Sequence, residues 1–106
     1  MSDTNATGPD GEIQVVDNPQ RSRYEARLGE RVLGIVEYDL DPAGDRIVLV
    51  HTEVLPHAEG MGVGSRLAKG ALEDVRSRGL KLTVECEFIA AYLKRHPRDY
   101  EDLVAG

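Results

Sequence analysis

Apolar and polar positions alternate along the first half of the chain and then change to a helical spacing. Up to Leu55, short apolar runs are separated by turn-forming residues, a pattern typical of β-strands. The expected strands are residues 13–16, 24–28, 31–40 and 46–55. The turns between them are short, which predicts an antiparallel meander. Its second strand is expected to be half-exposed, because charged residues alternate with Tyr24, Ala26 and Leu28, and its fourth to be a buried central strand.

The second half of the chain begins with a glycine-rich loop and continues as a helix. Apolar residues recur every three or four positions up to Gly79, a C-cap. The expected core face is Val63, Leu67, Ala68, Ala71, Leu72 and Val75. Residues 81–87 are predicted to form a fifth strand parallel to the fourth, and residues 89–96 a short helix that Pro97 ends. The predicted class is α+β: a mixed sheet of about five strands, one long helix and one short C-terminal helix.

Length and composition are those of one soluble domain. The chain has 106 residues, of which 41% are hydrophobic and 30% charged. Residues 1–12 have no large apolar side chain after Met1, so we expect a disordered tail there and a single domain over residues 13–106. The net charge of −6 argues against nucleic acid as a partner, because phosphate binding needs clustered Lys and Arg. The one cysteine, Cys86, excludes an internal disulfide and a Cys-rich metal site, and no metal is expected.

No segment has the features of a signal peptide or a membrane span. The longest apolar run, Ile47–Val50, is far too short to cross a bilayer. We therefore expect a soluble, cytoplasmic protein with no membrane partner. No feature of the sequence indicates its oligomeric state.

Three glycines alternate directly before the long helix, at Gly60, Gly62 and Gly64. Glycine lets the main chain approach a ligand closely, and a helix start offers unpaired N–H groups, so the loop suits a phosphate or pyrophosphate. The alternative is a turn whose glycines serve only the chain geometry. A nucleotide P-loop requires Gly-Lys-Ser/Thr and the dinucleotide fingerprint requires G-x-G-x-x-G, and neither is present. A pyrophosphate carried by a thin, extended molecule remains, and coenzyme A fits.

Five short motifs, in this order along the chain, resemble one family. They are Asp17-Asn18-Pro19, Arg23-Tyr24-Glu25-Ala26, His51-Thr52-Glu53-Val54, Glu59-Gly60-Met61-Gly62-Val63-Gly64 and Tyr92-Leu93-Lys94-Arg95-His96-Pro97. Together they are similar to the GNAT N-acetyltransferase superfamily, and most closely to its small single-domain branch, often called the YjdJ type. The helices that larger members place between their first two strands are missing. The resemblance implies a GNAT-like fold, acetyl-CoA as cosubstrate and an amine as acceptor.

The resemblance also implies where acetyl-CoA binds. The pantetheine arm would lie beside the fourth strand, and the pyrophosphate would sit on the N–H groups of the glycine loop. A basic run, Lys94–His96, would neutralise phosphate charge, although a solvated helix end is the alternative for it. The residues expected to contact acetyl-CoA are Thr52, Val54, Leu55, Gly60, Met61, Gly62, Val63, Gly64, Ser65, Lys94, Arg95 and His96.

By the same resemblance, four residues are candidates for catalysis. Cys86 would face the thioester, either as a nucleophile or as part of the wall, and a buried apolar filler is the third possibility. Its acidic neighbours disfavour a resting thiolate. Tyr92 would protonate the departing thiolate, or it packs on the sheet. His51 and Glu53 share a strand face, so either could take a proton from the amine, whereas a histidine in a central strand is often a core residue.

The leading hypothesis is an acetyl-CoA-dependent N-acetyltransferase. The alternatives are a CoA-binding module without turnover and a small interaction domain that retains the fold. The sequence does not identify the acceptor. The acidic balance favours a cationic amine, such as a polyamine, a lysine side chain or an amino terminus.

Overall fold

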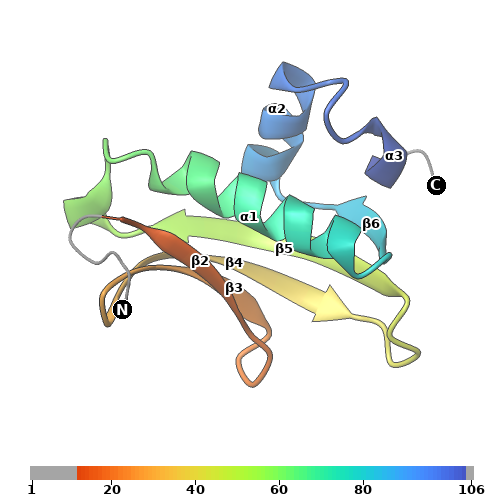
Figure 1. Ribbon diagram of the computed structural model, residues 1–106, viewed down its shortest axis with the longest axis horizontal. Helices are drawn as coiled ribbons and strands as arrows, with labels where there is room; N and C mark the ends of the chain where they lie inside the picture. Colours follow the sequence, from red (N-terminus) through yellow and green to blue (C-terminus); the bar gives the residue numbers. More distant parts are fainter. Residues whose placement is uncertain (1–11, 105–106) are drawn as a thin grey trace.

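The computed structural model describes residues 12–104 and shows a five-stranded sheet with its helices on one side (Figure 1). The elements are β2 (Gln14–Asn18), β3 (Arg23–Leu28), β4 (Arg31–Leu40), β5 (Arg46–Val54), a 3-10 turn (Pro56–Ala58), α1 (Val63–Ser77), β6 (Lys81–Val84), α2 (Glu87–Arg95) and α3 (Glu101–Val104). The predicted α+β class is confirmed. Apart from Glu12, the predicted tail lies outside the described residues. Within residues 12–104, no helix is long and apolar enough to span a membrane.

The strands follow one another across the sheet in the order β2-β3-β4-β5-β6. The first four pair antiparallel, as the meander predicts. β6 pairs parallel with β5, from Arg46 opposite Lys81 to Leu49 opposite Val84, which confirms the crossover through α1. The fourth strand is an interior strand, as expected, because β5 lies between β4 and β6. The expectation that it is buried holds only for its first half: Ile47 and Leu49 are buried, whereas His51 and Glu53 are exposed.

The core lies between the sheet and α1. All six predicted core residues of α1 are buried, as are Tyr24, Ala26 and Val36 of the facing strands. A Cβ built on Gly70 would lie 2.7 Å from the Cβ of Val15, so a glycine in the helix is what allows β2 to lie this close. The opposite side of the sheet, which we call the open face, carries no helix within residues 12–104 (Figure 1).

A β-bulge in β5 exchanges the two faces of that strand. Glu37 of β4 lies opposite His51, but the next residue, Tyr38, lies opposite Leu49, so Val50 is the extra residue. Before the bulge, the odd-numbered Leu49 is buried in the core. After it, the even-numbered Thr52 is on the core face, because it pairs with the buried Val36, and His51 is turned to the open face.

Four local features differ from the prediction. The fifth strand ends at Val84 rather than at residue 87, and α2 begins at Glu87 rather than at residue 89. The short helix α3 was not predicted. The fourth difference is Glu25, which the alternation of β3 places on an exposed face but which is only 2% exposed. Other polar side chains on the open face cover it, as described below.

Candidate functional site

The chains of β5 and β6 separate beyond Leu49. Their parallel pairing stops at Leu49 and Val84, and the amides of Glu85 and Cys86 both donate to the Leu49 carbonyl, at 2.9 and 3.1 Å. Because one carbonyl accepts both amides, the backbone after Val84 turns away from β5 and continues into α2. A cavity of about 300 Å³ opens there, lined by Val50, His51, Thr52, Glu85, Cys86, Glu87 and Phe88. We call it the Cys86 cavity.

Cys86 is the N-cap of α2 rather than a residue of the fifth strand. Its side chain is 6% exposed, and Sγ lies 3.0 Å from the hydroxyl Oγ1 of Thr52, within hydrogen-bonding distance. Because its amide is bonded to Leu49, the backbone at Cys86 is held as well. The thiol is therefore fixed at the wall of the cavity, against Thr52 of β5 on the other side.

The main chain of β5 offers hydrogen-bonding groups to this gap. The Leu55 amide donates to the Leu33 carbonyl at 2.9 Å, so Leu55 is bonded to β4. Bonded and non-bonded positions alternate along an antiparallel pair, which makes Thr52 and Val54 the positions whose N–H and C=O point away from β4. β6 has ended by then, so these groups face the gap. Of the residues expected to contact acetyl-CoA along this segment, Thr52 and Val54 of β5 present their main chain to the gap, and Leu55, directly after β5, does not.

The glycine loop ends at the start of α1. Gly62 is the N-cap with a φ of 76°, in the left-handed region that favours glycine, and no side chain caps the helix. The first helical bond runs from the Arg66 amide to the Gly62 carbonyl at 3.2 Å, so the amides of residues 63–65 have no acceptor in the helix. The first turn holds no acidic residue. The Met61 amide, by contrast, is already bonded to the Ala58 carbonyl at 3.2 Å.

Phe88 connects this loop to the Cys86 cavity. Its side chain lines the cavity, and its ring lies against Gly64, where an added Cβ would meet the ring at 2.6 Å. The ring is 38% exposed, one of the few large apolar side chains in the described residues that are so open. Phe88 was not among the predicted site residues, although its position two residues after Cys86 was the available signal. The loop and the cavity are thus parts of one surface.

His51 and Glu53 lie together on the open face of β5. The His51 Nε2 and Glu53 Oε1 atoms are 3.8 Å apart, and the side chains are 57% and 60% exposed. His51 is therefore not a core residue. It also lines the Cys86 cavity, so one of the two predicted proton acceptors borders the same opening as the thiol, whereas Glu53 does not line it.

Tyr92 does not line the Cys86 cavity. Its side chain is 7% exposed, and its ring packs against the rings of His96 and Tyr100, with centroid distances of 4.3 and 6.1 Å. Lys94 and Arg95 are exposed in the last turn of α2, whereas the cavity lies at the first turn. His96 also approaches Asp99, with 3.4 Å between Nδ1 and Oδ2. The structure does not bring these predicted residues to the thiol.

A second polar cluster lies on the open face, around Glu25. Arg23 Nε donates to the carboxylate at 2.8 Å, Arg27 Nε at 2.9 Å and the Asn18 amide at 3.1 Å. Burial opposes ionisation of this carboxyl, but these hydrogen bonds outweigh it and lower the pKa of Glu25 to about 2. Two guanidinium groups therefore share one carboxylate, and the cluster keeps a net positive charge.

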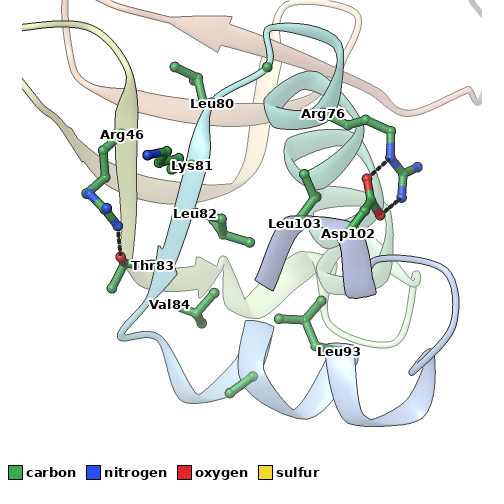
Figure 2. Close-up of a pocket in the computed structure, with 12 residues that line it drawn as sticks. Arg46, Arg76, Leu80, Lys81, Leu82, Thr83, Val84, Leu93, Asp102 and Leu103 are labelled. Carbon is green, nitrogen blue, oxygen red and sulfur yellow. Dashed lines mark hydrogen bonds and ion pairs between the residues drawn. The ribbon is translucent and has the colours of Figure 1, made fainter. Parts of the chain in front are cut away.

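A larger cavity lies elsewhere in the described residues. It measures about 750 Å³ and lies between β6, α2 and α3, where Leu82, Leu93 and Leu103 point into it and Arg76 pairs with Asp102 at its rim (Figure 2). None of the predicted site residues lines it. The smaller Cys86 cavity is the better candidate, because it combines a fixed thiol, free main-chain groups and a helix start. Among residues 12–104 there is no group of three His, Cys, Asp or Glu side chains arranged to hold a metal.

The gap between the two parallel strands is thus lined by a thiol and lies next to a glycine loop at a helix start. Residues 23–103 match the sequence profile of the GCN5-related N-acetyltransferase family, and the chain belongs to that family. Members of this family typically use acetyl-CoA. The match is consistent with the YjdJ-type branch without singling it out.

Curated relatives cover most of the chain. The mouse (Mus musculus) Protein NATD1 is 37% identical over 91 residues, which are 82% of this chain and 79% of that protein. The chicken (Gallus gallus) Protein NATD1 is 37% identical over 89 residues, 80% of this chain and 77% of that protein. The human (Homo sapiens) Protein NATD1 is 36% identical over 89 residues, 80% of this chain and 75% of that protein.

Proposed function

We propose that this protein is an N-acetyltransferase that moves an acetyl group from acetyl-CoA to an amine. The observation that carries the proposal is the gap after Leu49, where a fixed thiol and the outward-facing main chain of Thr52 border one cavity. The start of α1 lies next to this cavity, because Gly64 contacts Phe88 in its wall. Family membership supports the type of reaction. The acceptor amine and the use of Cys86 are the parts that need experiment.

Acetyl-CoA would bind as an added strand beside β5. The N–H and C=O groups of Thr52 and Val54 can pair with the two amides of the pantetheine arm, as an extended peptide pairs with a sheet edge. Its pyrophosphate would lie on the amides of residues 63–65, where the helix dipole favours negative charge and no acidic side chain competes. Phe88 stands between the two contacts and would close the side of the channel.

The reaction needs a neutral amine and a proton acceptor. The cosubstrate supplies the thioester, and the amine nitrogen attacks its carbonyl carbon, after which the C–S bond breaks and the thiolate takes up a proton. Glu53, directly or through His51, is placed on the open face to accept the proton that the amine loses. A general base at such a position contributes about 100-fold or more to the rate.

Cys86 has two possible roles, which one comparison separates. As a nucleophile, its Sγ would take the acetyl group first and pass it to the amine, and mass spectrometry of the protein after incubation with acetyl-CoA alone would find an acetyl adduct on Cys86. As part of the wall, it would orient the thioester together with Thr52. Under the nucleophile role, Cys86→Ala abolishes transfer and retains CoA affinity; under the wall role, Cys86→Ala retains appreciable turnover.

The proposal is tested by CoA release and product mass spectrometry with acetyl-CoA and a mixed amine library. We expect acetylated amines with the wild type and with Glu30→Gln, an exposed turn residue that serves as the control. A protein that binds CoA but acetylates no amine would instead be the non-catalytic CoA-binding module. A protein that binds no CoA would exclude both, and leave an interaction domain with this fold.

A further inference from the structure

A third cavity lies on the open face, next to the proposed proton acceptor. It measures about 300 Å³ and is lined by Arg23, Val32, Gly34, Ile35, Glu53 and Leu55. This volume is at the lower end of the range for small-molecule sites. Its lining is mostly apolar, with one positive and one negative side chain. We call it the open-face cavity.

The positive side chain, Arg23, is held in place by a buried carboxylate. Its Nε is bonded to Glu25, which is 2% exposed and is bonded to Arg27 as well. Within residues 12–104 no hydrogen bond is found for the two terminal nitrogens of Arg23, which is 23% exposed. The guanidinium is thus oriented through Nε, while its terminal N–H groups remain as donors for an anion.

The negative side chain, Glu53, connects the open-face cavity to the Cys86 cavity. Glu53 lines the first, its neighbour His51 lines the second, and the two side chains are 3.8 Å apart. Across the sheet, Glu25 lies opposite Ile35, and Ile35 lies opposite Glu53. Ile35 therefore forms an apolar floor between the arginine cluster on β3 and the acid on β5.

We propose that the open-face cavity binds the acceptor, and that the acceptor is a small amino acid whose amine and carboxylate are separated by a short apolar chain. The inference rests on the proposed acetyl transfer. The carboxylate binds the terminal N–H groups of Arg23, the apolar chain lies on Val32, Ile35 and Leu55, and the amine lies against Glu53, beside the opening to Cys86. The cavity has a positive side chain, Arg23, at one end and a negative side chain, Glu53, at the other. This arrangement fits an amino acid better than a polyamine, whose second ammonium group would be repelled by Arg23.

The test compares acceptors that differ only in the carboxylate. 6-Aminohexanoate and hexylamine have the same apolar chain, and only the first carries an anionic end. With the wild type we expect kcat/KM for 6-aminohexanoate to exceed that for hexylamine by about 10- to 100-fold, the size of a charge-assisted hydrogen bond. Arg23→Gln should remove most of that ratio. Arg27→Gln breaks the other ion pair of Glu25 without touching the cavity, so it controls for loss of stability and should keep the ratio.

A binding measurement separates this inference from the proposed function. In methyl NMR, 6-aminohexanoate should shift the signals of Val32, Ile35 and Leu55 in the wild type and in Arg27→Gln, and much less in Arg23→Gln. These shifts do not depend on turnover, so they would stand even if no acetyl transfer were found. Unmoved methyl signals, or an acceptor ratio that Arg23→Gln leaves unchanged while transfer proceeds, would overturn the inference. The second result would leave the acetyltransferase proposal intact.

Discussion

Tyr92 belongs to an aromatic cluster at the C-terminal end of α2. Its ring packs against His96 and Tyr100, away from the Cys86 cavity. Burial, together with the nearby Tyr92, raises the pKa of Tyr100 to about 12. Tyr92→Phe keeps the packed ring, and no hydrogen bond of the Tyr92 hydroxyl is found within residues 12–104. We therefore expect it to change the free energy of unfolding by less than about 1 kcal/mol.

The same substitution should leave kcat within about three-fold of the wild type, because loss of a general acid costs about 100-fold or more. Steady-state kinetics and denaturant unfolding measure the two effects. Tyr100→Phe removes the neighbouring hydroxyl of the same aromatic cluster and is the matched control. A loss of kcat by two orders of magnitude in Tyr92→Phe alone would place the hydroxyl at the reaction after all.

Glu25 gives the protein a pH dependence below neutrality. Its pKa is lowered from an ordinary value of 4.5 to about 2, so the folded state favours the ionised carboxylate. Stability from this group is present above pH 4.5 and is lost as the pH falls towards 2, amounting to about 3 kcal/mol in total. Unfolding free energies measured between these two pH values should fall less steeply in Glu25→Gln.

The control for this prediction is Glu37→Gln, an exposed carboxylate on the same face, which should keep the wild-type slope. Equal slopes in the wild type and in Glu25→Gln would show that the arginine cluster does not hold the carboxylate as described. Sequence alternation predicts on which face Glu25 lies. It does not reveal that Arg23 and Arg27, two residues before and after it, fold over the carboxylate and bury it.

At the scale of elements, the contact between α1 and the start of α2 depends on a glycine. In a helix, Gly→Ala normally stabilises by up to about 1 kcal/mol. At Gly64 the new methyl group would meet the Phe88 ring at 2.6 Å, so the ring has to move and the gain should disappear. In a Phe88→Ala background the same substitution should stabilise by the full amount. Thermal or denaturant unfolding of the wild type, the two single variants and the double variant measures the coupling between Gly64 and Phe88.

A gain of equal size in both backgrounds would mean that the Phe88 ring does not lie on Gly64. The cycle also clarifies what substitutions in the glycine loop can report. Valine at Gly62 faces a positive φ, and valine at Gly64 meets Phe88, so both affect the fold as well as any ligand. Loss of CoA affinity in either variant therefore needs an unfolding measurement beside it.

Elements with a regular pattern were predictable, and their ends were not. The buried face of α1 follows from helical spacing, and all six of its residues are correct. The end of β6 depends on two amides that share the Leu49 carbonyl, which no local pattern in residues 81–87 encodes. The position of the bulge at Val50 was not predictable either. Residues 47–50 are all apolar, so their spacing does not indicate which of them is the extra residue or where the faces exchange.

At the scale of the whole molecule, the candidate site is a consequence of sheet topology. The crossover through α1 makes β6 parallel to β5, and the early end of β6 leaves the last part of β5 without a neighbour. The bulge turns Thr52 to the core face, where its hydroxyl meets Cys86, and leaves His51 and Glu53 on the open face. The predicted thiol, the Thr52 main chain and His51 therefore border one cavity, although Cys86 lies more than 30 residues from the other two in sequence. Glu53 lies beside it, next to His51 on the open face.

Amide hydrogen exchange with and without saturating CoA is the most direct test of the claim that this gap holds the cosubstrate. We expect CoA to slow exchange at Thr52 and Val54, which face the gap, and at residues 63–65 in the first turn of α1. Amides of β2, on the far side of the sheet, should be unaffected and serve as the internal control. If bound CoA instead left these five amides unchanged, or protected only the larger cavity between β6 and α3, the assignment of the site would be wrong.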